Sequence, residues 1–275
     1  MVRSHVRFLL VLSAVALVTS VSCKKKPEFE PGTPKWRFAV NDEYCSPAIA
    51  SDGTVYAVSG DDRSLYAINP DGTLRWRYET GDYLYSPPAL AGDGVIYVVS
   101  DNSGLYAINP DGTFRWQSMI SNQDSRPPAI GEDGTIYMHL GDSLFALNPD
   151  GTPRWRLEVS GGDYSAPAVG PDGTIYVTTD DRFLHAVSPE GTLRWSYRLD
   201  SYISSLPAVD EDGTVYVVAG SDLCAVKPDG TRKWLYQSDE LGESSPARLR
   251  RRLVEETEAG ERAGSVRIAI ARSIE

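Results

Sequence analysis

The chain alternates short apolar runs with polar turns that contain glycine, and the same arrangement returns about every 40 residues. In the first complete repeat this pattern predicts four strands, at Ser46–Ala50, Thr54–Val58, Leu65–Ile68 and Thr73–Tyr78. Runs such as Val55–Val58 are apolar at consecutive rather than alternating positions, which is typical of strands covered on both faces. The pattern therefore predicts small antiparallel sheets that stack against one another.

Particular residue types keep step with this repeat. Tryptophan recurs at spacings of 40, 40, 39, 40 and 39 residues, as Trp36, Trp76, Trp116, Trp155, Trp195 and Trp234. The dipeptide Pro-Ala recurs in the same rhythm, and nine Asp-Gly pairs together with Glu190-Gly191 mark tight turns, where glycine adopts positive φ without strain. Four antiparallel strands in a unit of this length are typical of a β-propeller blade. We therefore expect an all-β fold, a β-propeller of four-stranded antiparallel blades, with five complete blades between Ser46 and Ser238.

A sixth blade is expected to be partial or divergent. A lone fourth strand, Thr33–Val40, precedes the complete repeats, and a lone first strand near Ser245–Ala247 follows them. Closing the ring would require the tail, residues 248–275, to supply further strands, yet Arg250–Arg252 fall where an apolar strand and a turn should come. Either the sixth blade has diverged or the end is a truncation or frameshift product. The abrupt loss of pattern after residue 247 favours the second alternative.

The composition is globular and acidic. Of 275 residues, 41% are hydrophobic, and 38 Asp and Glu residues exceed 27 Lys and Arg residues to give a net charge of -11. Binding to nucleic acid requires a basic surface, so the charge excludes nucleic acid as the expected partner.

The first 22 residues are predicted to be a signal peptide. Arg3 and Arg7 form a positive region, and the apolar run Phe8–Val21 is short for a membrane span. The following Ser20–Cys23 resembles the lipobox of bacterial lipoproteins, which implies cleavage before Cys23 and acylation of this cysteine. We therefore expect an exported, periplasmic protein with a lipid anchor, and the outer membrane is the expected membrane. An ordinary cleaved signal peptide is the alternative. Residues 23–32 then read as a short charged tether with no means of packing.

The repeat motif resembles a known family. The run Leu65–Trp76, preceded by Gly53–Tyr56, is similar to the PQQ-like β-propeller repeat, whose family includes the BamB-type lipoproteins of outer-membrane assembly. The resemblance covers residues 33–247. It implies that the tryptophan of each fourth strand docks between neighbouring blades, so all six tryptophans are expected to be structural.

No catalytic motif stands out in the sequence. It has no glycine-rich phosphate loop, haem-attachment motif or nucleophile elbow, and no adjacent cysteine pair of the kind found in quinone-dependent dehydrogenases of this fold. His139 and His185 are expected to be strand residues with satisfied hydrogen bonds, and Cys45 and Cys224 to be free thiols. The aspartates after the second strands are expected to form turns and not calcium sites. We therefore expect no cofactor, no metal, no small-molecule substrate and no enzymatic activity.

The connections from each fourth strand to the next blade are the candidate binding surface. In a propeller these loops gather on one face, and tyrosine there offers a large, rigid contact with a polar tip. The candidate partner-binding residues are Asp42, Tyr44, Asp82, Tyr83, Tyr85, Asp163, Tyr164, Asp200 and Tyr202. Alternatively, these residues only end strands and begin turns.

Three hypotheses about function follow from these features. The first is a non-catalytic scaffold, tethered to the membrane by lipid, that binds another envelope protein through its loop face and resembles an outer-membrane assembly factor. The acidic loops would suit a basic or polar partner surface. The second is an enzyme or a small-molecule binder that holds a quinone or a sugar in the central channel of the propeller. The third is a degraded gene product without a stable fold.

Overall fold

The computed structural model describes residues 34–40, 46–84, 86–120, 126–162, 165–203 and 205–237. These residues form twenty strands and no helix, and therefore no helix that could cross a membrane. The predicted signal peptide, tether and C-terminal tail lie outside the described residues, as do Cys23 and Cys45.

The strands form five sheets, each of four antiparallel strands in sequence order. Blade one consists of β1 (Ala48–Ile49), β2 (Val55–Ser59), β3 (Ser64–Ile68) and β4 (Leu74–Glu79). Blade two consists of β5 (Ala89–Leu90), β6 (Ile96–Ser100), β7 (Gly104–Ile108) and β8 (Phe114–Ser118). Blade three consists of β9 (Ala129–Ile130), β10 (Ile136–Leu140), β11 (Ser143–Leu147) and β12 (Pro153–Glu158). Blade four consists of β13 (Ala168–Val169), β14 (Ile175–Thr178), β15 (Phe183–Val187) and β16 (Leu193–Arg198). Blade five consists of β17 (Ala208–Val209), β18 (Val215–Ala219), β19 (Asp222–Val226) and β20 (Arg232–Gln237).

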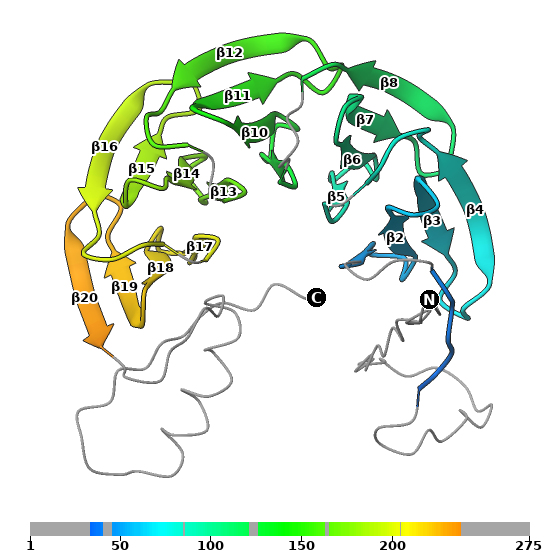
Figure 1. The fold of residues 1–275 in the computed structure, drawn as a ribbon, viewed down its shortest axis with the longest axis horizontal. Helices are drawn as coiled ribbons and strands as arrows, with labels where there is room; N and C mark the ends of the chain where they lie inside the picture. Colours follow the sequence, from blue (N-terminus) through cyan, green and yellow to red (C-terminus); the bar gives the residue numbers. More distant parts are fainter. Residues whose placement is uncertain are drawn as a thin grey trace, which may run out of the picture.

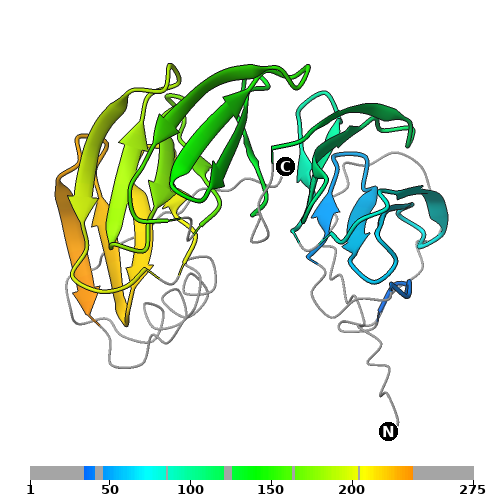
Figure 2. The same ribbon diagram turned by 45° about the horizontal axis from the view of Figure 1, so that its top comes forward.

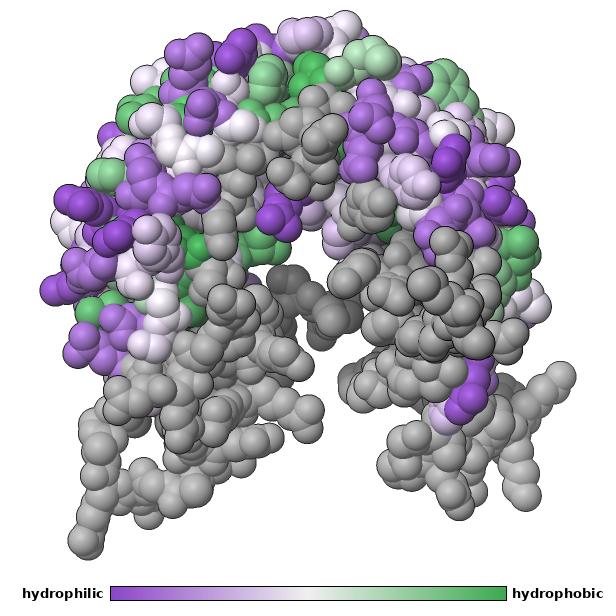
Figure 3. All heavy atoms as spheres, in the orientation of Figure 1, coloured by the Kyte–Doolittle hydropathy of each residue, from purple (hydrophilic) through white to green (hydrophobic). Residues whose placement is uncertain are grey.

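The five sheets are arranged as an arc, with the first strand of each blade innermost and the fourth outermost (Figures 1 and 2). Among the described residues the arc is open between blade five and blade one. Hydrophilic residues cover most of the described surface seen in Figure 3, with smaller hydrophobic patches between them. The prediction of an all-β propeller with five complete four-stranded blades is confirmed.

The hydrophobic core lies between the blades and not inside a single layer. Every residue of β2, β6 and β18 is buried, as the consecutive apolar runs predicted. One cluster joins Tyr56 and Leu65 of blade one to Ile96 and Ile108 of blade two, and similar clusters join each later pair of neighbours. Because each blade packs only on its neighbours, stability is a sum of blade and interface contributions, as in other repeat proteins.

A β-bulge in every blade positions a basic residue. The pairing of β3 with β4 shifts after Ala67, because Ala67 faces Trp76 whereas Ile68 faces Leu74, so Arg75 has no cross-strand partner. Its guanidinium instead lies 3.2 Å from the carboxylate of Asp52 in the turn between strands one and two. The same ion pair recurs in the other blades, as Arg115–Asp93, Arg154–Asp133, Arg194–Asp172 and Lys233–Asp212. Each pair is exposed and contributes about 0–1 kcal/mol, so its main effect is on the geometry of the turn.

The tryptophans connect successive blades. The indole nitrogen of Trp76 donates a hydrogen bond of 3.0 Å to the carbonyl of Pro110 in blade two, and its ring lies 5.7 Å from that of Tyr56. Trp116, Trp155 and Trp195 make the equivalent bonds to Pro149, Pro189 and Pro228. In each case the ring packs directly on the glycine of the turn between strands three and four.

Trp36 occupies the same kind of site on blade one. It donates to the carbonyl of Pro70 over 3.0 Å and packs on Gly72. Its segment, residues 34–40, forms no strand among the described residues, in contrast to the strand predicted at 33–40. Val40 and Phe38 nevertheless cover the face of blade one that points away from blade two. The segment therefore covers this end of the arc in the way that a neighbouring blade's outer strand would.

Candidate functional site

One end of the blades carries the less regular connections. Because neighbouring strands run antiparallel, the turns between strands two and three lie at the same end of each sheet as the connections to the next blade. We call this end the loop face; it includes residues 60–63 and 80–84. The Asp-Gly turns lie at the opposite end.

Four of the nine predicted partner-binding residues are described, and all four lie on the loop face. Asp82 and Tyr83 belong to the connection from blade one to blade two, and Asp200 and Tyr202 to the connection from blade four to blade five. The other five predicted residues lie outside the described residues, namely Asp42, Tyr44, Tyr85, Asp163 and Tyr164.

The two described tyrosines project from a fixed backbone. Tyr202 is 66% exposed and Tyr83 is 37% exposed. The carbonyl of Tyr83 accepts a hydrogen bond of 3.2 Å from the amide of Asp101, and that of Tyr202 accepts one of 2.7 Å from the amide of Gly220. The next residue in each loop is buried and pairs with the end of the following blade's second strand, as Leu84 with Ser100 and Ile203 with Ala219.

The Asp82 carboxylate is occupied within the protein. It accepts hydrogen bonds from the amides of Tyr83 and Asn102, at 2.8 and 2.9 Å, and from the Ser103 hydroxyl at 3.2 Å. Desolvation raises the pKa of Asp82, but these hydrogen bonds outweigh it and the net pKa is lowered. Asp82 thus holds the connection against the turn of blade two.

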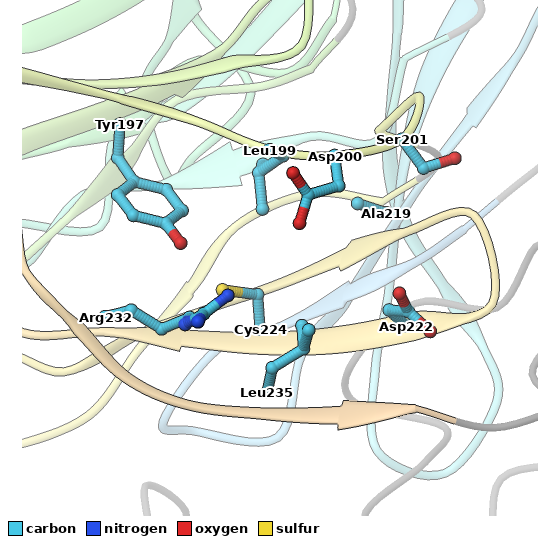
Figure 4. Close-up of a pocket in the computed structure, with 9 residues that line it drawn as sticks. All are labelled: Tyr197, Leu199, Asp200, Ser201, Ala219, Asp222, Cys224, Arg232 and Leu235. Carbon is cyan, nitrogen blue, oxygen red and sulfur yellow. The ribbon is translucent and has the colours of Figure 1, made fainter.

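Asp200 is an exposed residue whose carboxylate points toward the strands of blade five. It lines a small recess between blades four and five, together with Tyr197, Cys224 and Arg232 (Figure 4). Cys224 is a buried free thiol whose pKa is raised by desolvation, so it is a poor nucleophile. The recess is lined by strands two to four and by the loop, and not by the innermost strands β13 and β17.

Two arginines that the sequence analysis did not single out lie against the exposed tyrosines. The Arg63 guanidinium lies 4.8 Å from the centre of the Tyr83 ring, and that of Arg182 lies 4.6 Å from the centre of the Tyr202 ring. Each arginine closes the turn between strands two and three of its blade. The available sequence signal was the tripeptide Asp-Asp-Arg, which occurs in the first and fourth repeats as residues 61–63 and 180–182.

A match to a protein-family model identifies the family of this chain. The model described as outer membrane protein assembly factor BamB, of the PQQ-like repeat type, matches residues 29–166 and 141–263. The chain belongs to this family. The resemblance to PQQ-like repeats is thereby confirmed, and no curated protein sequence matches the chain.

Solved structures similar to this member of the BamB family include BamB itself and two lyases. BamB from Moraxella catarrhalis has a TM-score of 0.59 at 18% identity, over 74% of this chain and 65% of that chain. The virginiamycin B lyase from Staphylococcus aureus has a TM-score of 0.60 at 16% identity, over 70% of this chain and 69% of that chain. A streptogramin B lyase has a TM-score of 0.56 at 16% identity, over 71% of this chain and 68% of that chain. At these identities the likeness shows a shared fold.

The expectation that the chain is not an enzyme is corrected by these neighbours. The same fold is found in virginiamycin B lyase and streptogramin B lyase, which are enzymes, as well as in BamB. The absence of a few known catalytic motifs, including the cysteine pair of quinone-dependent dehydrogenases of this fold, does not exclude other chemistry, because one fold can carry several unrelated activities. Among the described residues, no group of three or more His, Cys, Asp or Glu side chains could hold a metal ion.

Blade four of this BamB-family protein also contains a series of hydrogen-bonded polar side chains that runs from the buried His185 to the surface. The Thr179 hydroxyl lies 2.5 Å from the Asp181 carboxylate and 3.3 Å from Nε2 of His185, while Nδ1 of His185 lies 2.8 Å from the Ser196 hydroxyl. When the Thr179 hydroxyl donates to the Asp181 carboxylate, its oxygen can accept a hydrogen bond from Nε2–H of His185. Nδ1 of the neutral imidazole then carries no proton and accepts a hydrogen bond from the Ser196 hydroxyl. Burial lowers the pKa of His185, partly opposed by the charge of Asp181, and the imidazole is therefore neutral at pH 7.

This burial predicts a pH dependence of stability. Because the pKa of His185 is lower in the folded chain than its ordinary value of about 6.5, the unfolded chain takes up a proton first as the pH falls. The contribution of His185 is thus fully present above about pH 6.5 and is lost progressively below it. In urea unfolding at pH 7.5 and pH 5.5, H185F should lose less stability between the two values than the wild-type protein. An equal loss in both proteins would show that His185 does not titrate in this way.

Proposed function

We propose that this chain is an exported envelope propeller that binds another protein through its loop face, in the manner of an outer-membrane assembly factor. The main support is the geometry of the two connections that follow blades one and four. Each holds one exposed tyrosine, Tyr83 or Tyr202, on a backbone fixed by hydrogen bonds to the next blade. Tyrosine in such a setting provides contact area at little entropic cost, which is a property of binding hot spots. Membership of the BamB family supports an envelope protein as the partner.

The proposal includes a lipid anchor at Cys23. The basis is the sequence before this residue, Ser20-Val21-Ser22, and the family's link to the outer membrane. Metabolic labelling with a radioactive or clickable fatty acid should mark the wild-type protein and not C23S. Equal labelling of both would remove the anchor from the proposal and leave the binding face unaffected.

Photo-crosslinking in the native envelope tests the binding face. A photoreactive amino acid at Ser201, beside Tyr202, should capture one envelope protein reproducibly. The same amino acid at Leu193 is the matched control, because Leu193 is 45% exposed and lies beside an Asp-Gly-type turn at the opposite end of the same blade. Combining the Ser201 probe with Y83A and Y202A should reduce capture. Equal capture at both positions, or undiminished capture by the double variant, would contradict binding through the loop face.

A further inference from the structure

The backbone at the two arginines differs from that of every other described turn between strands two and three. Arg63 has a φ of 51° and Arg182 a φ of 72°, and they are the only residues other than glycine with positive φ among the described residues. In the other three blades, the residue with positive φ in or beside this turn is a glycine, namely Gly104, Gly141 and Gly220. Glycine adopts this conformation without the steric conflict that a Cβ introduces. In blades one and four, by contrast, the residue with positive φ is the last one before strand three and carries a long, charged side chain.

The arginine side chains are placed in the same way in both blades. In blade one the guanidinium donates to the carbonyl of Gly81, two residues before Tyr83, over 3.4 Å. In blade four it donates to the carbonyl of Asp200, two residues before Tyr202, over 3.5 Å. The main-chain carbonyl of each arginine also accepts a hydrogen bond from the end of the fourth strand, from Thr80 or from Leu199. The agreement of these contacts in two separate blades makes them one recurring arrangement and not two accidents of loop packing.

The two guanidinium groups take no part in the ion pairs that link the described residues. Neither Arg63 nor Arg182 forms an ion pair with a residue that the structure describes, whereas the basic residue of every bulge does. Of the nearby loop carboxylates, that of Asp82 binds the turn of blade two, whereas that of Asp200 faces the recess and forms no ion pair with Arg182. Each connection therefore presents a partner with an exposed tyrosine ring and, packed against this ring, a guanidinium group.

We infer that Arg63 with Tyr83, and Arg182 with Tyr202, are two equivalent docking stations for a protein partner that brings a carboxylate to each guanidinium and an apolar side chain to each ring. A guanidinium stacked on an aromatic ring is held in one orientation, which favours bidentate contact with a carboxylate. The inference rests on the proposed function and changes its partner chemistry, because the acidic loops alone suggested a basic partner. The stations lie on opposite sides of the arc, in blades one and four (Figure 1). A partner that fills both gains from two linked contacts.

A phosphate of an anionic membrane would offer a guanidinium similar charge. The loop face disfavours this source, because the residues that precede each arginine, Asp61, Asp62, Asp180 and Asp181, are acidic. A continuous anionic surface would meet these carboxylates together with the arginines, whereas a single carboxylate on a protein segment meets only the guanidinium.

Replacing both arginines with glycine separates binding from folding. Since both arginines have positive φ, which glycine adopts without strain, R63G/R182G should unfold at the same urea concentration as the wild-type protein, or at a higher one. The probes are two short synthetic peptides that alternate phenylalanine with a charged residue, Glu in one and Lys in the other, measured by fluorescence anisotropy at physiological salt. The wild-type protein should bind the Glu peptide in preference to the Lys peptide, and the double variant should bind the Glu peptide about tenfold more weakly or worse. R115A, which alters an arginine at the opposite end of blade two, should bind as the wild-type protein does.

Other outcomes overturn the inference. Preference for the Lys peptide, or undiminished binding of the Glu peptide by R63G/R182G, would show that the guanidinium groups are not the recognition element. Arginine-dependent binding to vesicles of anionic phospholipid without binding of the Glu peptide would assign the stations to a membrane instead. If the double variant still crosslinks its envelope partner through Ser201 as efficiently as the wild-type protein, the stations are wrong and the proposed function stands. Absence of a loop-face crosslink in the wild-type protein would instead count against the proposed function itself.

Discussion

Trp155→Ala is expected to lower the free energy of unfolding by about 3–5 kcal/mol, the usual range for removing a large aromatic side chain from a core. The indole of Trp155 donates a 2.8 Å hydrogen bond to the carbonyl of Pro189, and its ring lies 5.9 Å from that of Tyr137. The ring also packs on Gly191 of blade four. Its removal would therefore open a gap in the interface between blades three and four.

The position of this interface adds a second expected effect. Each blade packs only on its neighbours, and this interface divides the five described blades into a group of three and a group of two. Weakening one internal interface of a repeat array can uncouple the parts on either side. In urea unfolding followed by circular dichroism and by tryptophan fluorescence, the two signals should coincide for the wild-type protein and separate for W155A.

Trp155→Phe is the matched control for this substitution. It keeps a ring against Gly191 and Tyr137 but removes the indole N–H that reaches Pro189. The expected loss is about 1 kcal/mol, typical of a single hydrogen bond. Equal losses for the Phe and Ala variants would mean that the hydrogen bond, and not packing between blades, gives Trp155 its importance.

The sequence predicted the blades well because their signals are local. Tight turns require glycine at positive φ, and fully covered strands require consecutive apolar residues, so both can be seen without tertiary information. The first strands are shorter than predicted, as in β1, which spans Ala48–Ile49 and not Ser46–Ala50. Pro47 has no N–H to donate, so pairing begins only after it.

The candidate site was less predictable because its chemistry depends on side-chain direction. The loop acids were interpreted as surface charge, yet Asp82 bonds to the amide of Asn102, twenty residues further along the chain. The arginines were overlooked because Arg63 and Tyr83 come together only when the end of β4 returns to the turn before β3. A sequence pattern shows which residues share a loop face, but not which of them point outward.

Gly191→Ala is expected to cost about 3 kcal/mol, the sum of backbone strain and overpacking. Gly191 has a φ of 83°, and a Cβ added to it would lie 2.6 Å from the Trp155 ring. Gly81 is the matched control, because its φ is 80° and an added Cβ would meet no atom within 4 Å. Gly81→Ala should therefore cost only the strain of a left-handed backbone, about 1–2 kcal/mol.

A double-mutant cycle connects this prediction to the first. If the cost of Gly191→Ala arises from its contact with Trp155, then in a W155A background the ring is gone and only the backbone strain remains. The cost of Gly191→Ala should fall there to that of Gly81→Ala, so the two substitutions should not be additive. Strict additivity in urea unfolding would mean that Trp155 and Gly191 do not constrain each other. In that case the spacing of tryptophan and glycine along the repeat would need a cause other than their contact between blades.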